Sequence, residues 1–312
     1  MENLVISASV VLPMLLMMLV GYISRRTGIV TEDTMRKVNK LLFRVFLPFL
    51  VMRNVYTSDI STAFSPRLLI FSLLLIGGMY VLIFFVIRAI EKDNPRRGSL
   101  IQACFRSNFI IFGIPVLETL YGAESTGVAS ILIAVIIPFY NVLAVVTFEV
   151  HRGGKPDFKK ILKGIVTNPL IVSSVLGAIF LLTGLKMPKI LDEAINGIGK
   201  IATPLAFVIL GSLFDFDAIR GGKKQIVIGL LGRLVVFPLI GLTLAVLLGF
   251  TGPELAVIMI MCGAPPAVTS YTMAQQMEGD AELSGSLVIL GSIFSILTIF
   301  VITFILKTIG AL

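Results

Sequence analysis

Histidine, cysteine and charged residues are scarce in this chain of 312 residues. The single histidine, His151, falls in a segment expected to be a basic loop, so the sequence offers no histidine-based metal site or proton relay. Cys104 and Cys262 fall inside apolar segments, where packing is the ordinary role of a free thiol. The sequence contains no phosphate-binding loop, ATPase motif or evident nucleophile–base set. We therefore expect no enzyme activity, no cofactor, no metal site and no ATP-driven step.

Charged residues make up only 14% of the chain, whereas hydrophobic residues make up 56% and the mean hydropathy is +1.00. Soluble domains contain ~25% charged and ~45–50% apolar residues, so this composition predicts an integral membrane protein. The first apolar run lacks a basic segment before it and is followed by Arg25 and Arg26, which favours a retained span over a cleaved signal peptide. We predict ten spans, near 4–24, 35–57, 66–90, 99–121, 125–150, 161–184, 190–214, 223–249, 253–277 and 283–308.

Lysine and arginine gather in alternate loops, those after the first, third, fifth and seventh predicted spans. Loops enriched in these residues usually face the cytoplasm. We therefore expect a multi-pass protein of the cell (plasma) membrane with both termini extracytoplasmic. The same loops account for the net charge of +8, and no nucleic acid partner is needed to explain it.

The second half of the chain repeats features of the first half about 156 residues later. The repeated residues are ones that bend or end a chain: Pro13, Gly21, Thr27, Gly28, Pro48 and Asp59 return as Pro169, Gly177, Thr183, Gly184, Pro204 and Asp215. Duplicated hydrophobic halves of this kind are typical of secondary transporters. Because each half would hold an odd number of spans, the second half must enter the membrane from the opposite side. We predict two inverted five-helix repeats, 1–152 and 161–312, joined by a short cytoplasmic linker at 153–160.

The fourth and the ninth predicted spans contain residues that interrupt a helix. Span four reads QACFRSNFIIFGIPVLETLYG from Gln102 to Gly122, and span nine contains MCGAPPAVTSYTMAQQ from Met261 to Gln276. Proline lacks an N–H and glycine loosens the backbone, and the polar groups set free survive in a membrane only inside protein or beside a wet cavity. Matched breaks in two halves point to a binding site. The candidate substrate-binding residues are Arg106, Asn108, Gly113, Pro115, Pro265, Pro266, Thr269 and Ser270.

The broken ends favour binding of an anion. A half-helix N-terminus carries roughly half a positive charge, and two such ends meeting in the membrane would attract a carboxylate. Charges buried in membranes are costly and are usually functional or paired. Arg106 is therefore a countercharge for this anion, a partner in a structural salt bridge or a snorkelling side chain. The sequence leaves open the roles of four further charged residues: Lys200, Arg233, Glu118 and Glu149. Structural pairing is favoured for the two cations, Lys200 and Arg233.

At these two breaks the sequence resembles the auxin efflux carrier family, which includes the plant PIN proteins and bacterial relatives. SNFIIFGIPVLETLYG, from Ser107 to Gly122, resembles the family's pattern of Asn followed by G-[IF]-P-L and a terminal Y-G. The stretch from Ala264 to Gly291 is similar to the family's segment P-x-x-V…A, a variable loop and S-x-x-[VI]-x-x-G. NPLIVSSVLGAIF and PLAFVILGSLF fit the family's spans six and seven. The resemblance covers essentially the full chain, and the short loop between the halves is that of a bacterial-type member.

This resemblance implies an all-α, NhaA/ASBT-like fold of ten transmembrane helices in two inverted five-helix repeats, with crossed, interrupted helices four and nine. In that fold helices 1, 2, 6 and 7 form a scaffold, and helices 3–5 and 8–10 form a transport domain that moves like an elevator. Family substrates are small organic anions, which include auxin and carboxylates such as malate or malonate. Arg106 departs from the plant pattern and favours a more highly charged substrate than auxin.

We therefore expect a secondary transporter or facilitator of a small organic anion, a mono- or dicarboxylate. A sodium/proton antiporter of the same fold is an alternative, although neither break contains an acidic residue and Glu118 is the nearest. A non-transporting, anion-sensing membrane receptor is another, although the predicted spans leave little room for a signalling domain. The expected partners are the anion and the lipid bilayer; a coupling ion (proton or sodium) and a homodimer stay open.

Overall fold

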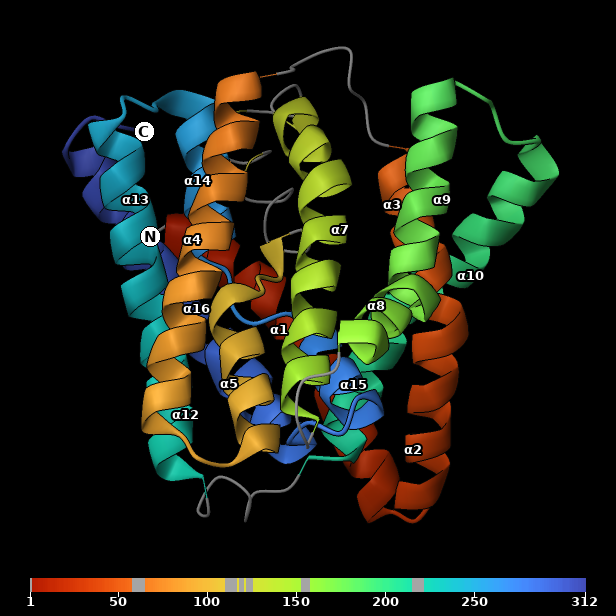
Figure 1. The fold of residues 1–312 in the computed structure, drawn as a ribbon. Helices are drawn as coiled ribbons and strands as arrows, with labels where there is room; N and C mark the ends of the chain where they lie inside the picture. Colours follow the sequence, from red (N-terminus) through yellow and green to blue (C-terminus); the bar gives the residue numbers. More distant parts are fainter. Residues whose placement is uncertain are drawn as a thin grey trace.

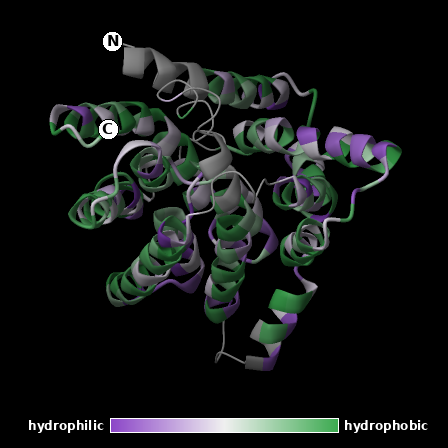
Figure 2. Cartoon of the chain, turned by 90° about the horizontal axis from the view of Figure 1, so that it is seen from above, coloured by the Kyte–Doolittle hydropathy of each residue, from purple (hydrophilic) through white to green (hydrophobic). Residues whose placement is uncertain are grey.

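The structure, a computed structural model, describes residues 2–57, 65–109, 117, 121, 126–152, 158–214 and 222–312. Within these ranges the secondary structure is helical apart from one isolated bridge. Five helices are long and apolar enough to cross a membrane. Hydrophobic residues cover outward faces of the bundle (Figure 2), and Leu74, Leu239 and Leu247 are among the most exposed. The prediction of an all-α membrane protein is confirmed, because an apolar surface of this extent is stable only against lipid.

The helices of the first half follow the predicted spans closely. Side-chain oxygens of Thr31, Ser65 and Asp93 accept the backbone N–H three residues on, and these caps fix the starts of three helices. The elements are α1 (Glu2–Arg26), α2 (Glu32–Leu41), η1 (Leu42–Phe46), α3 (Leu47–Tyr56), α4 (Pro66–Ile90), α5 (Asn94–Phe105) and α7 (Thr126–His151). His151 is therefore the last residue of α7, where it is buried, and its expected place in a loop was wrong.

The second half also follows the predicted spans, with one division. The Oδ1 of Asn168 accepts the N–H of Leu170, so predicted span 161–184 consists of two helices that meet at Asn168. The elements are α8 (Phe158–Thr167), α9 (Pro169–Thr183), α10 (Lys189–Ser212), α12 (Lys223–Leu231), η3 (Gly232–Val236), α13 (Phe237–Leu247), α14 (Gly252–Gly263), α15 (Thr269–Gln276) and α16 (Ala281–Thr308). Residues 153–157 of the expected linker lie outside the described residues.

Two of the long helical segments contain a π-helical turn just before a proline. The turn η1 precedes Pro48, and η3 precedes Pro238. A proline ring crowds the carbonyl four residues back, and a π turn moves that carbonyl out of the way. The N–H of Leu47 accordingly bonds to the carbonyl of Leu42, five residues earlier.

The helices form two groups in Figure 1, with α2, α3, α9 and α10 to one side and α4, α5, α12, α13 and α16 to the other. Helix α1 lies along α10, and α3 lies along both α9 and α10. On the other side α5 packs against α4, α7, α12 and α16, and α14 packs against α13 and α16. The broken segments therefore belong to the second group, and α7 contacts α3 of the first.

Candidate functional site

The candidate site forms where the two broken segments meet. The N–H of Asn108 donates to the carbonyl oxygen of Pro265 at 2.9 Å, and the N–H of Ala267 donates to the carbonyl oxygen of Arg106 at 3.3 Å. Pro266 and Ser107 form the isolated antiparallel bridge between these two bonds. Because the two prolines have no N–H with which to continue α14, the segments satisfy each other's backbone groups across the break.

A cavity of about 170 Å³ opens beside this crossing. Helices α3, α7 and α10 contribute the walls that face the broken segments. The lining residues are Leu47, Leu50, Val51, Asn54, Arg106, Ser107, Asn108, Phe109, Ile137, Tyr140, Thr203, Ala267, Val268 and Thr269. Pockets for drug-sized ligands measure ~300–1,000 Å³, so this cavity suits a molecule of few atoms.

Arg106 is a buried cation whose partners among the described residues are neutral. Its exposure is 5%, its Nη2 donates to Oδ1 of Asn141 at 2.8 Å, and its Nη1 lies 2.9 Å from Sδ of Met273. The ion pairs found in the described ranges all involve other residues. A buried charge without a counterion is costly, so the guanidinium favours an anion in the adjoining cavity.

Further buried polar atoms at the crossing have no hydrogen-bond partner within the described part of the chain. Oγ of Ser107 and Nδ2 of Asn108 belong to residues that line the cavity, and Oγ of Ser270 lies behind it at 1% exposure. Nδ2 of Asn141, whose Oδ1 accepts a hydrogen bond from Arg106, also has no partner among the described residues. Buried polar atoms are usually paired, and each of these groups can donate a hydrogen. Together they form a donor-rich wall suited to an acceptor ligand.

The structure brings together three of the residues predicted from sequence. Arg106, Asn108 and Thr269 line one cavity although they come from different halves of the chain. Thr269 is also the first residue of α15, whose positive end therefore lies at the cavity. Gly113 and Pro115 lie outside the described residues.

Sequence reasoning missed other polar residues that line the cavity. Asn54 of α3 and Thr203 of α10 line the cavity, and so does Tyr140 of α7. Thr203 could have been identified from the sequence, because it directly precedes Pro204, the counterpart of Pro48 in the repeat. The sequence indicated Asn54 more weakly, as an uncharged polar residue inside an apolar helix.

Arg233 contacts the crossing from outside the cavity lining. This residue of η3 is fully buried, and its Nε and Nη2 donate to the carbonyl oxygens of Ala264 and Met261 at 2.8 and 2.7 Å. Its Nη1 lies 3.4 Å from the carbonyl oxygens of both Cys104 and Phe105. The structural pairing expected for this cation is therefore with carbonyl groups and not with a carboxylate of the described residues.

The other charged residues with open roles lie away from the cavity or outside the described ranges. Lys200 is exposed on α10. Oε1 of Glu149 is 3.4 Å from Nη1 of Arg152 at the end of α7. Glu118 lies outside the described residues. Neither Lys200 nor Glu149 is among the residues that line the cavity.

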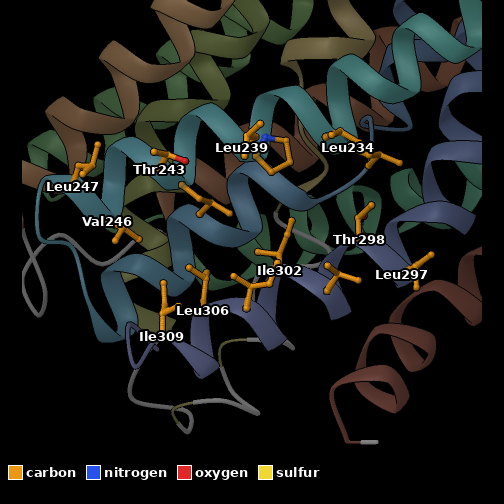
Figure 3. Close-up of a pocket in the computed structure, with 15 residues that line it drawn as sticks. Leu234, Leu239, Thr243, Val246, Leu247, Leu297, Thr298, Ile302, Leu306 and Ile309 are labelled. Atoms are coloured by element: carbon orange, nitrogen blue, oxygen red, sulfur yellow. The ribbon is translucent and has the colours of Figure 1, made fainter.

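A larger cavity of about 520 Å³ lies between α13 and α16 (Figure 3). Leu239, Leu247 and Ile309 line it and are strongly exposed, so it is a groove on the outer face of the bundle. Its described lining residues are uncharged, and Thr243 and Thr298 are its polar members. An apolar groove of this kind offers no countercharge for an anion, so the smaller cavity is the better candidate.

A helical membrane protein with a cavity beside two interrupted segments is typical of membrane transporters. The family model described as "Membrane transport protein" matches residues 6–159 and 157–303, and the chain belongs to this family, that of the auxin efflux carriers. The predicted resemblance is thereby confirmed.

Two relatives and one solved structure illustrate the relationship. An uncharacterized transporter of Methanocaldococcus jannaschii is 26% identical over 302 residues, which are 94% of this chain and 97% of that protein. Auxin efflux carrier component 6 of Arabidopsis thaliana is 28% identical over 135 residues, which are 41% of this chain and 24% of that protein. The sodium proton antiporter MjNhaP1 of M. jannaschii superposes with a TM-score of 0.54 over 96% of each chain at 15% identity, a likeness of fold alone.

Proposed function

We propose that this protein is a secondary transporter or facilitator of a small organic anion, a mono- or dicarboxylate. The observation that carries the proposal is the buried guanidinium of Arg106, which lines the cavity and has only neutral partners among the described residues. A carboxylate there would supply the missing countercharge. It would also accept hydrogen bonds from the side chains of Ser107 and Asn108, whose buried polar atoms have no described partner.

The size of the cavity favours a short acid such as malonate or malate over indole-3-acetate. The volume of about 170 Å³ is small for a ligand that carries a bicyclic ring. Asn54 of α3 and Thr203 of α10 also line the cavity, and their side chains would bind a second polar end of the ligand. We therefore rank dicarboxylates above the bulkier monocarboxylate.

An elevator mechanism fits this arrangement. In our proposal the spans that contain α1, α3, α9 and α10 form the scaffold, and the remaining spans form the transport domain, within a ten-helix fold of two inverted repeats, 1–152 and 161–312. Two observations support the inversion. Gly21 of α1 packs closely on α10, and its counterpart Gly177 of α9 packs closely on α3. An inverted repeat exchanges these two contacts, because it relates the first span to the sixth and the second to the seventh. The distribution of lysine and arginine among the loops favours extracytoplasmic termini in the cell membrane.

Uptake into proteoliposomes tests this function. Purified protein would be reconstituted and given labelled malonate, malate or indole-3-acetate, with and without an imposed proton or sodium gradient. We expect saturable uptake of the short dicarboxylates above that of empty liposomes, and the gradients would reveal the coupling ion. Folded protein that takes up none of the three anions would refute the proposal, and binding without uptake would favour an anion-sensing receptor.

Sodium/proton antiport is the second candidate, and the fold shared with MjNhaP1 favours it. The described lining of the cavity contains a cation, Arg106, and no acidic residue. A cation carrier needs acidic or carbonyl ligands at its site, so this lining supports an anion instead. Sodium-dependent proton movement in the same proteoliposomes, without carboxylate uptake, would reverse the ranking.

A further inference from the structure

Two helix C-terminal ends meet at the crossing, and one arginine binds both. Helix α5 ends with the carbonyl groups of Cys104 and Phe105, and α14 ends with those of Met261 and Ala264. Arg233 lies within hydrogen-bond distance of all four oxygens, at 2.7–3.4 Å. The last carbonyls of a helix have no partner within it, so Arg233 satisfies groups that would otherwise be bare inside the membrane.

We propose that Arg233 is a positioning residue that makes the cavity selective for anions without touching the substrate. Its charge neutralises the C-terminal ends of α5 and α14 and thereby leaves the charge of Arg106 available to the ligand. The inference rests on the proposed function and adds a residue to it. Arg233 is not among the residues that line the cavity, so its effect would be electrostatic and through the backbone of the crossing.

The magnitudes show why this compensation matters. A helix C-terminus carries roughly −0.5 of an elementary charge, so the two ends together carry about one negative charge. Arg106 directly follows the end of α5 and carries one positive charge. Without a second cation, the ends would largely cancel the attraction of Arg106 for an anion. Arg233 removes this cancellation, because it carries the opposite charge and is in contact with both ends.

The π turn η3 explains how a long charged side chain is held there. Gly232 precedes Arg233, and a Cβ at Gly232 would stand 2.8 Å from Sγ of Cys104. The absence of a side chain at Gly232 lets this turn approach α5 closely, and the close approach places the guanidinium between the two helix ends. The ring of Phe237, in the next turn, covers the guanidinium at 4.9 Å.

Two substitutions separate the charge of Arg233 from its hydrogen bonds. Arg233→Gln keeps a donor but removes the charge, whereas Arg233→Lys keeps the charge on a different donor. We expect Arg233→Gln to raise the KM for malonate by about tenfold or more, since a unit charge removed from a low-dielectric site costs this much at close range. Arg233→Lys should stay within about threefold of the wild-type KM, with little change in maximal rate for either variant. Arg44→Gln is the matched control, because Arg44 lies in the other π turn and is exposed.

The outcomes separate the inference from the function it rests on. An unchanged KM in Arg233→Gln, or a tenfold higher KM in a folded Arg233→Lys, would overturn the charge role while carboxylate uptake by the wild type stands. Absence of wild-type uptake would instead refute the proposed function. Hydrogen exchange in detergent then tests Arg233 without substrate. The amides of residues 104–108, 261–264, 267 and 268 should exchange faster in the Gln variant than in the Lys variant. Equal exchange in both variants would reject the positioning role of Arg233. The exchange experiment also tests this role if Arg233→Gln is too unstable for transport measurements.

Discussion

Gly21 of α1 lies against the carbonyl group of Val208 in α10, so closely that a Cβ on Gly21 would stand 1.9 Å from the carbonyl oxygen. Gly177 of α9 is its counterpart about 156 residues later, and a Cβ there would stand 2.6 Å from the carbonyl oxygen of Met52 in α3. Both contacts bring helix backbones together in a way that only glycine permits, as at other close contacts between membrane helices. The repeated glycines therefore have a packing role that is visible only in the structure.

Gly21→Ala should destabilise the protein by about 1–3 kcal/mol, because the new methyl group meets a backbone oxygen that has no room to retreat. Thermal unfolding in detergent measures the effect. Gly78→Ala is the matched control, since Gly78 also lies within a helix and a Cβ there meets nothing within 4 Å. Equal melting temperatures for the two variants would contradict the close packing of α1 on α10.

Asn108→Ala should lower the apparent affinity for the transported anion and leave the fold intact. The backbone of Asn108 holds the crossing through its bond to Pro265, and this bond survives the substitution. The side-chain amide, which has no described partner for Nδ2, is the part lost. We expect KM to rise about tenfold or more, as for one hydrogen bond to a charged group, with Thr298→Ala in the outer groove as the control. Unchanged transport by the folded variant would remove Asn108 from the site.

Arg106→Gln should weaken uptake of a dianion more than uptake of a monoanion. The attraction between the guanidinium and the ligand grows with the ligand's charge, whereas a purely structural arginine would affect both ligands alike. Competition by malonate and by acetate against one labelled substrate gives the two affinities in the same membranes. Equal losses for both competitors would assign Arg106 to the fold alone.

A covalent cross-link between α2 and α15 should block transport without preventing folding. Asn39 of α2 is fully buried, and its Nδ2 donates to Oε1 of Gln275 in α15 at 2.6 Å. In the proposed elevator this bond links the scaffold to the moving domain and must break in every cycle. A short bifunctional thiol reagent on Asn39→Cys/Gln275→Cys should therefore stop uptake, while each single variant keeps it. The reagent is applied in a Cys104→Ser/Cys262→Ser background, so that only the two introduced thiols can react. Full uptake by the cross-linked protein would exclude movement at this contact.

Glu278 should contribute a small stability that depends on pH. A hydrogen bond from Arg152, at 2.7 Å, lowers the pKa of Glu278 below its ordinary value of 4.5. The folded-state pKa is depressed, so the contribution is complete above the unfolded value and is lost as pH falls through the folded value. Glu278→Gln should melt slightly lower than the wild type at pH 7, by less than about 1 kcal/mol because the pair is exposed.

The difference between Glu278→Gln and the wild type should disappear below the folded pKa. Arg152→Gln should lower the melting temperature at least as much, because it also removes the contact of Arg152 with Glu149. In an Arg152→Gln background, Glu278→Gln should have no further effect, since its partner is already absent. A difference that persists in acid would assign the effect to something other than this ion pair. The measurement is a series of melting curves in detergent from pH 7 downward.

Helix positions were largely predictable from the sequence because hydrophobic runs of bilayer length carry their own signal. The predicted span 66–90 and the helix α4 (Pro66–Ile90) coincide. The break within predicted span 161–184 was less certain, since the proline after Asn168 fits both a kink and a helix start. The number of spans stays a prediction, because parts of the chain lie outside the described residues.

The sequence by itself determined that the chain is a membrane protein, that it belongs to a transporter family, and that Arg106, Asn108 and Thr269 lie beside helix breaks. Membrane spans and helix breaks depend on residues that are neighbours in the sequence, so the sequence alone is sufficient to detect them. Only the tertiary structure decided which distant groups meet there. Asn54 and Thr203 come from helices far along the chain, and the partners of Arg233 are backbone carbonyls, which every residue carries and no sequence pattern distinguishes. Contacts of this kind depend on how the helices cross, which is set by packing over the whole chain.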